Sequence, residues 1–400
     1  MTAALSAPRI TASGPALLSA QTAGPRADNV AKLAAIARDL RSDTLTVPTD
    51  AMFAAMAEAS RGDDVYLEDE TTTSFEAELA ALAGKEAALF VVSGTLSNQL
   101  AIRTHLLQPP YSILCDARSH IHRYEAGGAA FHSGAALETV APQNGHHLTW
   151  AHDVQPNLVL GDDVHSAPTR LVSLENSLNG TILPQDEVLR IREGLDALDE
   201  DIKLHLDGAR LWNVAAETGL SIKELCAPFD TVSMCLSKGL GAPVGTVLVG
   251  PSAFIRKARH FRKLFGAGIR QSGGLAAAAR VAVVQHFPKL RATHELARFA
   301  AKGMQELGVE ITSGAETSMF FYDPTPLGFD AATLAVRAAK LEPALHLASG
   351  PRIVVHHQTS AEAIDDLLAL VAQLKDEFAD RAGTHAKAVN GSLYSGMKKA

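Results

Sequence analysis

Several features that would place this chain in a common class are scarce in its sequence. The 400 residues include only three cysteines, and no two of them form a CxxC pair. Neither a disulfide framework nor a zinc knuckle is expected, and buried free thiols in a reducing compartment account better for Cys115, Cys226 and Cys235. Aromatic residues make up 5% of the chain, and Trp150 and Trp212 are expected to be packing residues rather than ligand platforms.

Positive charge and long apolar runs are also scarce. The 36 Lys and Arg residues are outnumbered by 44 Asp and Glu, so the formal net charge is -8 and no basic face for nucleic acid is expected. No apolar run approaches the roughly 20 residues that cross a bilayer, so no membrane partner is expected either. These absences fit a cytoplasmic location.

The first 38 residues are expected to form an extension without stable structure. The first 28 are rich in Ala, Ser, Thr and Pro and have no acidic residue before Asp28. A mitochondrial presequence shares this composition, which makes a mitochondrial location the alternative. Three prolines and two glycines interrupt any helix there, so the unstructured extension is the preferred interpretation.

Short apolar runs alternate with amphipathic stretches between Leu79 and Val249, which favours an α/β fold. Strands that alternate with helices indicate right-handed crossovers and a mainly parallel sheet with helices on both faces. Such a sheet places ligands beyond the carboxyl ends of its strands. The runs predicted to be strands are Ala87–Val92, Ser112–Cys115, Leu171–Glu175, Lys203–Leu206 and Thr231–Leu236.

A smaller α+β domain is predicted to follow the large one. A long Ala-rich helical stretch, roughly Gly273–Leu307, leads into it. We predict a large domain over residues 39–280, a small C-terminal domain over 281–380 and a loose tail from 381 to 400. The strands expected in the small domain lie near Val309–Thr312, Ser318–Tyr322 and Arg352–His357, and its final helix near Ala361–Phe378.

Candidate binding and catalytic residues follow three of the predicted strands. Gly94 and Thr95 open a helix after the first strand, where unpaired backbone N–H groups suit a phosphate. Asp207 ends the fourth strand, and Lys238 follows the fifth after 31 further residues. Each alone favours an ordinary role: an N-cap, a turn and a surface lysine.

The order of these three features changes that interpretation. In a parallel sheet they converge on one edge. A carboxylate can keep the pyridine nitrogen of pyridoxal phosphate (PLP) protonated, and a desolvated lysine amine can form a Schiff base. Together the three features predict a PLP site with Lys238 as its lysine.

From about Asp39 to about Gln358 the chain resembles the low-specificity L-threonine aldolases of PLP fold type I. Their fold has a mainly parallel large domain and a smaller C-terminal domain, as in aspartate aminotransferase. The motifs that carry the resemblance are DLRSDT from Asp39, GDDVY from Gly62, SHIHRYEAGG from Ser119, HLDGAR from His205, SKGLGAPVG from Ser237 and RQSG from Arg270.

The resemblance implies a role for each matching residue. Lys238 holds PLP, Asp207 faces the pyridine nitrogen and His120 stacks on the ring. The phosphate is bound by Gly94 and Thr95, with Lys263 and Arg270 reaching it from a neighbouring subunit of a homotetramer, a dimer of dimers with shared active sites. The residues implied near the substrate carboxylate are Ser42, Arg210 and Arg352, with Arg210 also near the cofactor, and those near the substrate side chain are His165 and Tyr66.

The implied activity is cleavage of L-threonine, L-allo-threonine and related β-hydroxy amino acids to glycine and an aldehyde. His120 and His165 are both candidate bases, since the ordinary pKa of histidine lies near neutrality. A β-eliminating lyase, an aldolase for aryl-serines and a catalytically silent homologue are the alternatives. A nicotinamide enzyme is disfavoured because no GxGxxG follows the first strand.

No metal site is predicted. The adjacent pairs His146-His147 and His356-His357 are expected to be ordinary histidines, because neighbouring residues on a strand point to opposite faces.

Some positions depart from the family pattern. Leu67 and Glu70 stand where Gly and Pro are expected, and these changes put the loop beside Tyr66 and the substrate preference in question. Ala267 and Ile269 replace Gly and Met, and Ser97 replaces a frequent Gly.

Overall fold

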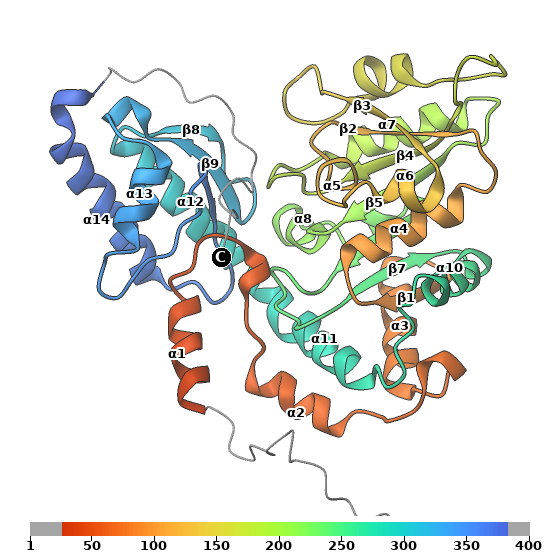
Figure 1. The fold of residues 1–400 in the computed structure, drawn as a ribbon, viewed down its shortest axis with the longest axis horizontal. Coiled ribbons are helices and arrows are strands. Elements are labelled where there is room, and N and C mark those ends of the chain that lie inside the picture. Colours follow the sequence, from red (N-terminus) through yellow and green to blue (C-terminus); the bar gives the residue numbers. More distant parts are fainter. Residues whose placement is uncertain (1–25, 383–400) are drawn as a thin grey trace, which may run out of the picture.

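The computed structural model describes residues 26–382, which form a large and a small domain (Figure 1). A seven-stranded sheet in the order β1-β7-β6-β5-β4-β2-β3 forms the centre of the large domain. Six strands run in one direction and β7 runs against them, so the prediction of a mainly parallel sheet is confirmed. The strands are β1 (Ala87–Val91), β2 (Ser112–Asp116), β3 (Ala136–Val140), β4 (Thr169–Glu175), β5 (Lys203–Gly208), β6 (Thr231–Cys235) and β7 (Thr246–Gly250).

Helices cover both faces of this sheet because its strands are apolar on both sides. In β1, Leu89 and Val91 pack against α4 and α10, whereas Ala88 and Phe90 belong to the core on the opposite face. The helices of one face are α4 (Gly94–His105), α5 (His120–Arg123), α6 (Gly128–Ser133) and α10 (Ser252–Leu264). Those packed on the other face are α3 (Glu70–Ala83), α7 (Gln185–Asp196), α8 (Leu211–Thr218), α9 (Ile222–Cys226) and α11 (Gly273–His286), with α2 (Asp50–Glu58) lying on α11.

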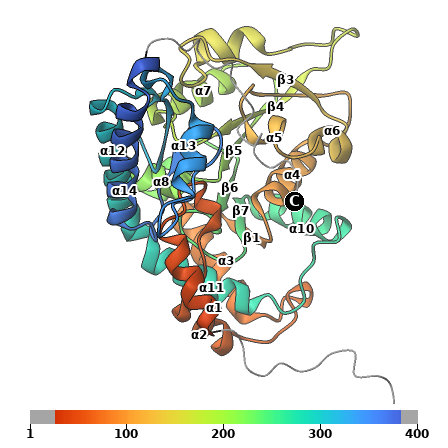
Figure 2. The same ribbon diagram turned by 60° about the vertical axis from the view of Figure 1, so that its left-hand side comes forward.

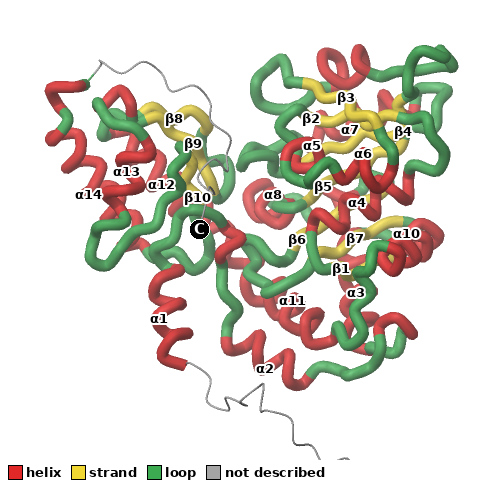
Figure 3. The backbone as a smooth tube through the Cα atoms, in the orientation of Figure 1, coloured by secondary structure: helices red, strands yellow, loops and turns green. Residues whose placement is uncertain are grey.

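The small domain has its own sheet and its own core. Its antiparallel strands follow the order β10-β9-β8, and α12 and α14 lie side by side on it (Figures 2 and 3). Leu40, far earlier in the chain, is buried in this second core. The elements are α12 (Leu290–Glu306), β8 (Glu310–Ser313), β9 (Met319–Asp323), α13 (Ala331–Ala338), β10 (Arg352–Val354) and α14 (Ala361–Glu377).

Three details differ from the expectations. The long helical stretch after Gly273 is two helices, α11 and α12, separated at Phe287–Lys289, where Pro288 lacks the N–H that a continuous helix needs. Residues 26–36 form helix α1 (Arg26–Ile36), within the segment expected to be unstructured. The remainder of that extension and the tail beyond residue 382 lie outside the described residues.

No helix among residues 26–382 combines the length and the apolar character that spanning a membrane requires.

A buried ion pair joins the loop after α2 to the sheet. The Arg262 Nη2 and the Asp64 Oδ2 are 2.5 Å apart, and both side chains are almost fully buried. Arg262 also donates to the Phe90 carbonyl (2.9 Å). Asp64 also lies 3.3 Å from Arg259 Nη1, but Arg262 supplies the shorter and more deeply buried of its two cation contacts, and a buried charge requires such a partner.

Replacing Arg262 should therefore be costly. We expect Arg262→Ala to lower the free energy of unfolding by roughly 3–5 kcal/mol, since it leaves the Asp64 carboxylate buried without this cation. Urea unfolding measures the change. The half-exposed pair of Arg280 and Glu78 is the matched control, and Arg280→Ala should cost about 1 kcal/mol or less. Equal costs for the two variants would contradict the argument.

Candidate active site

The carboxyl ends of three neighbouring strands bring the predicted residues to one edge of the large sheet. Glu175 ends β4 and lies beside Asp207 on β5 in the register of the sheet. Lys238 follows β6, the next strand. The charge of Lys238 acts on the carboxyl of Glu175, and also on Asp43 and His120. The sequence prediction that this lysine shares an edge with Asp207 therefore agrees with the geometry.

Asp207 is a buried carboxylate with two donors. Its side chain is 3% exposed. Asn98 Nδ2 donates to Oδ2 at 2.7 Å, and the Ala209 N–H donates to Oδ1 at 3.0 Å. The two bonds fix the orientation of the carboxyl group. Asn98 comes from the second turn of α4, and sequence reasoning missed it because a buried asparagine in a helix has no local signature.

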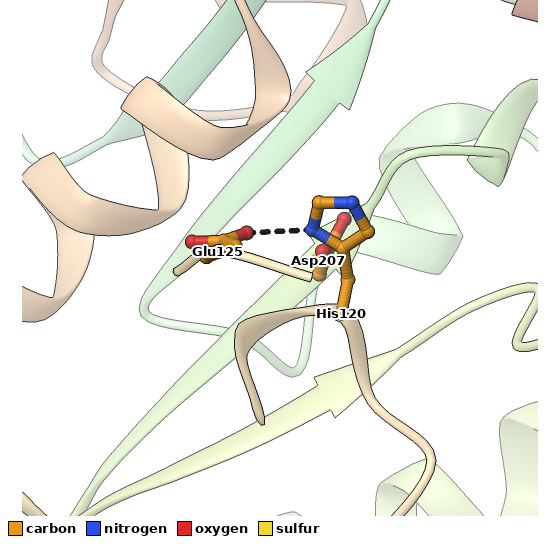
Figure 4. A group of neighbouring side chains, drawn as sticks. All are labelled: His120, Glu125 and Asp207. Carbon is orange, nitrogen blue, oxygen red and sulfur yellow. Dashed lines mark hydrogen bonds and ion pairs between the residues drawn. The ribbon is translucent and has the colours of Figure 1, made fainter. Parts of the chain in front are cut away.

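Glu125 is the second buried carboxylate of the edge. Its oxygens accept from Asn98 Nδ2 (2.8 Å), Gln99 Nε2 (2.6 Å) and His120 Nδ1 (2.8 Å). Figure 4 shows the His120 ring with Nδ1 directed at Glu125 and with Asp207 close by. Glu125 lies inside the same sequence motif as His120, but its contact with that histidine depends on the fold.

These contacts set the protonation of His120. Burial would lower the pKa of its imidazole, but the hydrogen bond to Glu125 and the charges of Asp207 and Glu125 outweigh that effect and raise the pKa. The backbone N–H of His120 donates to Glu175 Oε2 (2.8 Å). Burial, together with the charge of the nearby Asp207, raises the pKa of the Glu175 carboxyl. Ligand atoms of His120, Glu125 and Asp207 lie within 4.8 Å of one another, a spacing that suits a metal. Protein donors already engage both carboxylates.

The turn after β1 has the geometry of an anion cradle. Gly94 and Thr95 are the first residues of α4, and Ser93 caps the helix by accepting from the Leu96 N–H (3.1 Å). A side chain at Gly94 would place its Cβ 2.7 Å from Cys235 Sγ, so only glycine brings the backbone this close to the strand that precedes Lys238. Phosphate-binding chemistry fits this helix end.

A short N-terminal segment gathers the residues predicted for the substrate carboxylate. Arg210 forms two hydrogen bonds with the fully buried Asp43, at 2.9 and 2.6 Å. Burial would raise the pKa of Asp43, but the charge and hydrogen bonds of Arg210 lower it. Ser42 precedes that aspartate, and Arg352 Nη2 donates to the Arg41 carbonyl (3.0 Å). Ser42, Arg210 and Arg352 therefore meet around residues 41–43.

Four predicted residues lie elsewhere on the described chain. The His165 side chain is 86% exposed and contacts Asp163, on the loop before the amino end of β4, whereas Lys238 follows a carboxyl end. The others, Tyr66, Lys263 and Arg270, are exposed and lie near one another: the Asp64 N–H donates to the Arg270 carbonyl, and Gly268 lies between Val65 and Lys263. Their roles stay predictions, since two of them were placed in a neighbouring subunit's site.

The two adjacent histidine pairs do not lie in strands, so the expectation that their side chains point to opposite faces does not apply to them. His146 and His147 bring their Nδ1 atoms to 2.8 Å, because they lie in a turn rather than a strand. His356 and His357 donate instead to main-chain carbonyls.

Leu67 marks the point where the loop beside Tyr66 departs from the family pattern. It adopts left-handed φ and ψ values of 63° and 31°, which cost an L-residue roughly 1–2 kcal/mol. The glycine that the pattern calls for would remove that strain, so the backbone shape is retained here without the residue that suits it.

Known proteins place this fold and site in one class. The family model for beta-eliminating lyases matches residues 39–325, and the chain belongs to that family. Within it, the chain groups with the low-specificity L-threonine aldolases, enzymes of PLP fold type I, so the predicted family and fold class are confirmed.

Two relatives support this grouping, and one solved structure shows the same fold. The low-specificity L-threonine aldolase of Candida albicans is 47% identical over 332 residues, which covers 82% of this chain and 87% of that protein. That of Saccharomyces cerevisiae is 44% identical over 342 residues, 85% of this chain and 87% of the relative. A solved structure of Leishmania major threonine aldolase has a TM-score of 0.69 at 18% identity, covering 84% of this chain and 98% of that one.

The contact between Glu125 and His120 gives a pH prediction. In Glu125→Gln the negative partner is lost, so the pKa of His120 should fall. A raised pKa stabilises the folded state at pH values below the unfolded pKa of histidine, and this contribution disappears as the pH rises through the folded value. The pH-dependent part of the stability loss should therefore be largest in acid.

An NMR titration of His120 and unfolding curves at several pH values measure both effects. Glu138→Gln, at an exposed position, is the control and should leave the His120 titration in place. An unchanged His120 pKa in Glu125→Gln would contradict the assignment.

Proposed function

We propose that this protein cleaves L-threonine and L-allo-threonine to glycine and acetaldehyde with PLP bound at Lys238. The observation that carries the proposal is the convergence of Lys238, the buried Asp207 and the N-terminus of α4 on one sheet edge. Membership in the family of low-specificity L-threonine aldolases supports the same substrate class.

The donor set of this edge fits PLP. Lys238 Nζ would bind the aldehyde carbon, and the carboxyl group of Asp207 would face the pyridine nitrogen. Gly94 and Thr95 would hold the phosphate, and His120 would lie against the ring. When bound, PLP supplies an electron sink for the charge released at Cα.

Arg210 and Arg352 orient the substrate through its carboxylate. A guanidinium matches two carboxylate oxygens, and Asp43 keeps Arg210 in a single orientation by engaging its Nε and Nη2. Ser42 adds a hydroxyl beside them. The fixed carboxylate in turn sets the direction of the Cα–Cβ bond, which must break.

His120 is the base that this geometry favours. Its Nδ1 is held by Glu125, so the neutral imidazole has its lone pair on Nε2. Nε2 takes the proton of the β-hydroxyl while the Cα–Cβ bond breaks and the C=O bond of acetaldehyde forms. A proton returned to Cα completes glycine. Since only neutral His120 accepts a proton, turnover rises with pH through its pKa.

The reaction and its lysine can be tested together. Wild-type protein supplied with L-threonine should release acetaldehyde and glycine in equal amounts. Ammonia and a keto acid would instead identify a β-eliminating lyase. Lys238→Ala should lose the visible absorbance band of lysine-bound PLP and lower kcat by at least about a hundredfold. Lys340→Ala, at an exposed site, is the control. A Lys238→Ala protein that kept both the band and turnover would refute the proposal.

We also propose that the active sites are shared in a homotetramer. The large apolar residues Tyr66, Leu67 and Leu264 are each 59–73% exposed. Such exposed apolar residues suit burial by a second copy of the chain. Lys263 lies beside this surface, from which its ammonium would reach the partner's phosphate.

Light scattering should give the mass of four chains. Lys263→Ala should keep that mass but weaken PLP binding about tenfold, because one phosphate contact is lost. Lys302→Ala, on the exposed face of α12, is the matched control. Unchanged PLP affinity in Lys263→Ala would contradict the shared site.

A further inference from the structure

Three successive backbone carbonyls, beginning with that of Lys238, each accept a hydrogen bond from a side chain in another part of the chain. Thr46 Oγ1 donates to the Lys238 carbonyl at 3.1 Å. His357 Nδ1 lies 2.9 Å from the Gly239 carbonyl, and His286 Nδ1 lies 2.6 Å from the Leu240 carbonyl. A carbonyl oxygen only accepts, so Nδ1 carries the proton in both histidines.

The two histidines also stack on each other. Their ring centroids are 4.2 Å apart with an angle of 29° between the planes. Burial, followed by the proximity of His286, lowers the pKa of His357 to about 4. Burial likewise lowers the pKa of His286. Both rings are therefore neutral near pH 7, and the pair presents two fixed N–H donors without charge repulsion.

The lysine loop is shaped to receive this pair. Gly241 has a φ of +77°, and a Cβ there would lie 2.7 Å from His357 Cε1. Its N–H donates to the Lys238 carbonyl (2.8 Å) and closes a turn directly after the lysine. Three glycines in Gly239–Gly245 make the loop intrinsically free, so it needs external contacts to adopt one conformation.

The contacts arrive from two domains. His286 ends α11, which packs on the large sheet, whereas His357 follows β10 of the small domain. The neighbours of His357 hold the N-terminal segment: His356 Nε2 donates to the Asp39 carbonyl (2.9 Å), and Gln358 exchanges two 3.0 Å hydrogen bonds with the Val47 backbone. Three consecutive side chains thus join the small domain to both chain segments that border the site.

We propose that His286 and His357 are positioning residues that clamp the Lys238 loop and couple its geometry to the small domain. The inference rests on the proposed function for the role of Lys238, but the clamp is a property of the backbone. A lysine amine at the end of four rotatable bonds depends on where its backbone is held, and a misplacement of about 1 Å can cost as much as a hundredfold in rate.

Two substitutions at each position separate the hydrogen bond from packing. His357→Phe and His286→Phe keep a ring in the stack but remove the donor. His357→Asn and His286→Asn remove the ring but keep an amide N–H near the position of Nδ1. His260→Phe is the matched control, since Nδ1 of this exposed histidine on α10 also lies 2.9 Å from a main-chain carbonyl, that of Arg256.

Hydrogen–deuterium exchange of residues 236–245 measures the clamp without any activity. We expect the Phe variants to exchange this loop about tenfold faster, and to lower kcat about tenfold with little change in KM. In the Phe variants, the pH midpoint at which the visible band of lysine-bound PLP titrates should also change. The Asn variants should recover most of the protection of the loop and most of kcat, and His260→Phe should change neither.

The outcomes distinguish the two proposals. Suppose that the wild-type protein releases no aldehyde but the Phe variants exchange the loop faster than the wild type. This result would support the clamp and refute the proposed function. Normal aldehyde release with unchanged exchange and kcat in the Phe variants would overturn the clamp. Equal losses in the Phe and Asn variants would also overturn it, because they would assign the effect to packing alone.

Discussion

The carboxyl group of Asp207 lies where almost no water reaches it, and a polar group in such a place requires hydrogen-bond partners. Asn98 supplies one, and because its amide has two N–H bonds it also serves Glu125. Glu125 in turn holds His120. One buried amide on α4 thus sets the positions of two carboxylates and, through them, the imidazole that lies above the sheet edge.

The same edge depends on how the two domains meet. Residues 39–47 run between them: Leu40 belongs to the small-domain core, whereas Asp43 pairs with Arg210 of the large domain. His357 and Gln358 then bind the lysine loop and this segment from the other side. A rotation of the small domain would move Arg352 and His357 together, so it would alter the contact with the Arg41 carbonyl and the contact with the lysine loop at the same time.

The neighbours of two half-buried histidines move their pKa values in opposite directions. Beside two carboxylates, the pKa of His120 rises and its ring can exchange a proton. The pKa of His357, buried against another imidazole and a carbonyl, falls to about 4, so its ring remains a neutral donor. The residue type is the same in both places, and the surrounding charge decides whether the pKa of the imidazole rises or falls.

Sequence alone determined five of the seven strands of the large sheet, its mainly parallel character and the convergence of Lys238 and Asp207 on one edge, because periodicity and motif order are local properties that survive in the unfolded chain. Tertiary structure alone decided that Asn98 serves Asp207, that Asp43 orients Arg210 and that His286 and His357 hold the lysine loop. These partners are separated by tens to hundreds of residues and carry no local pattern. His165 and Lys263 show the remaining limit: one chain brings neither to the edge, and contacts with a neighbouring chain are not encoded in the order of motifs.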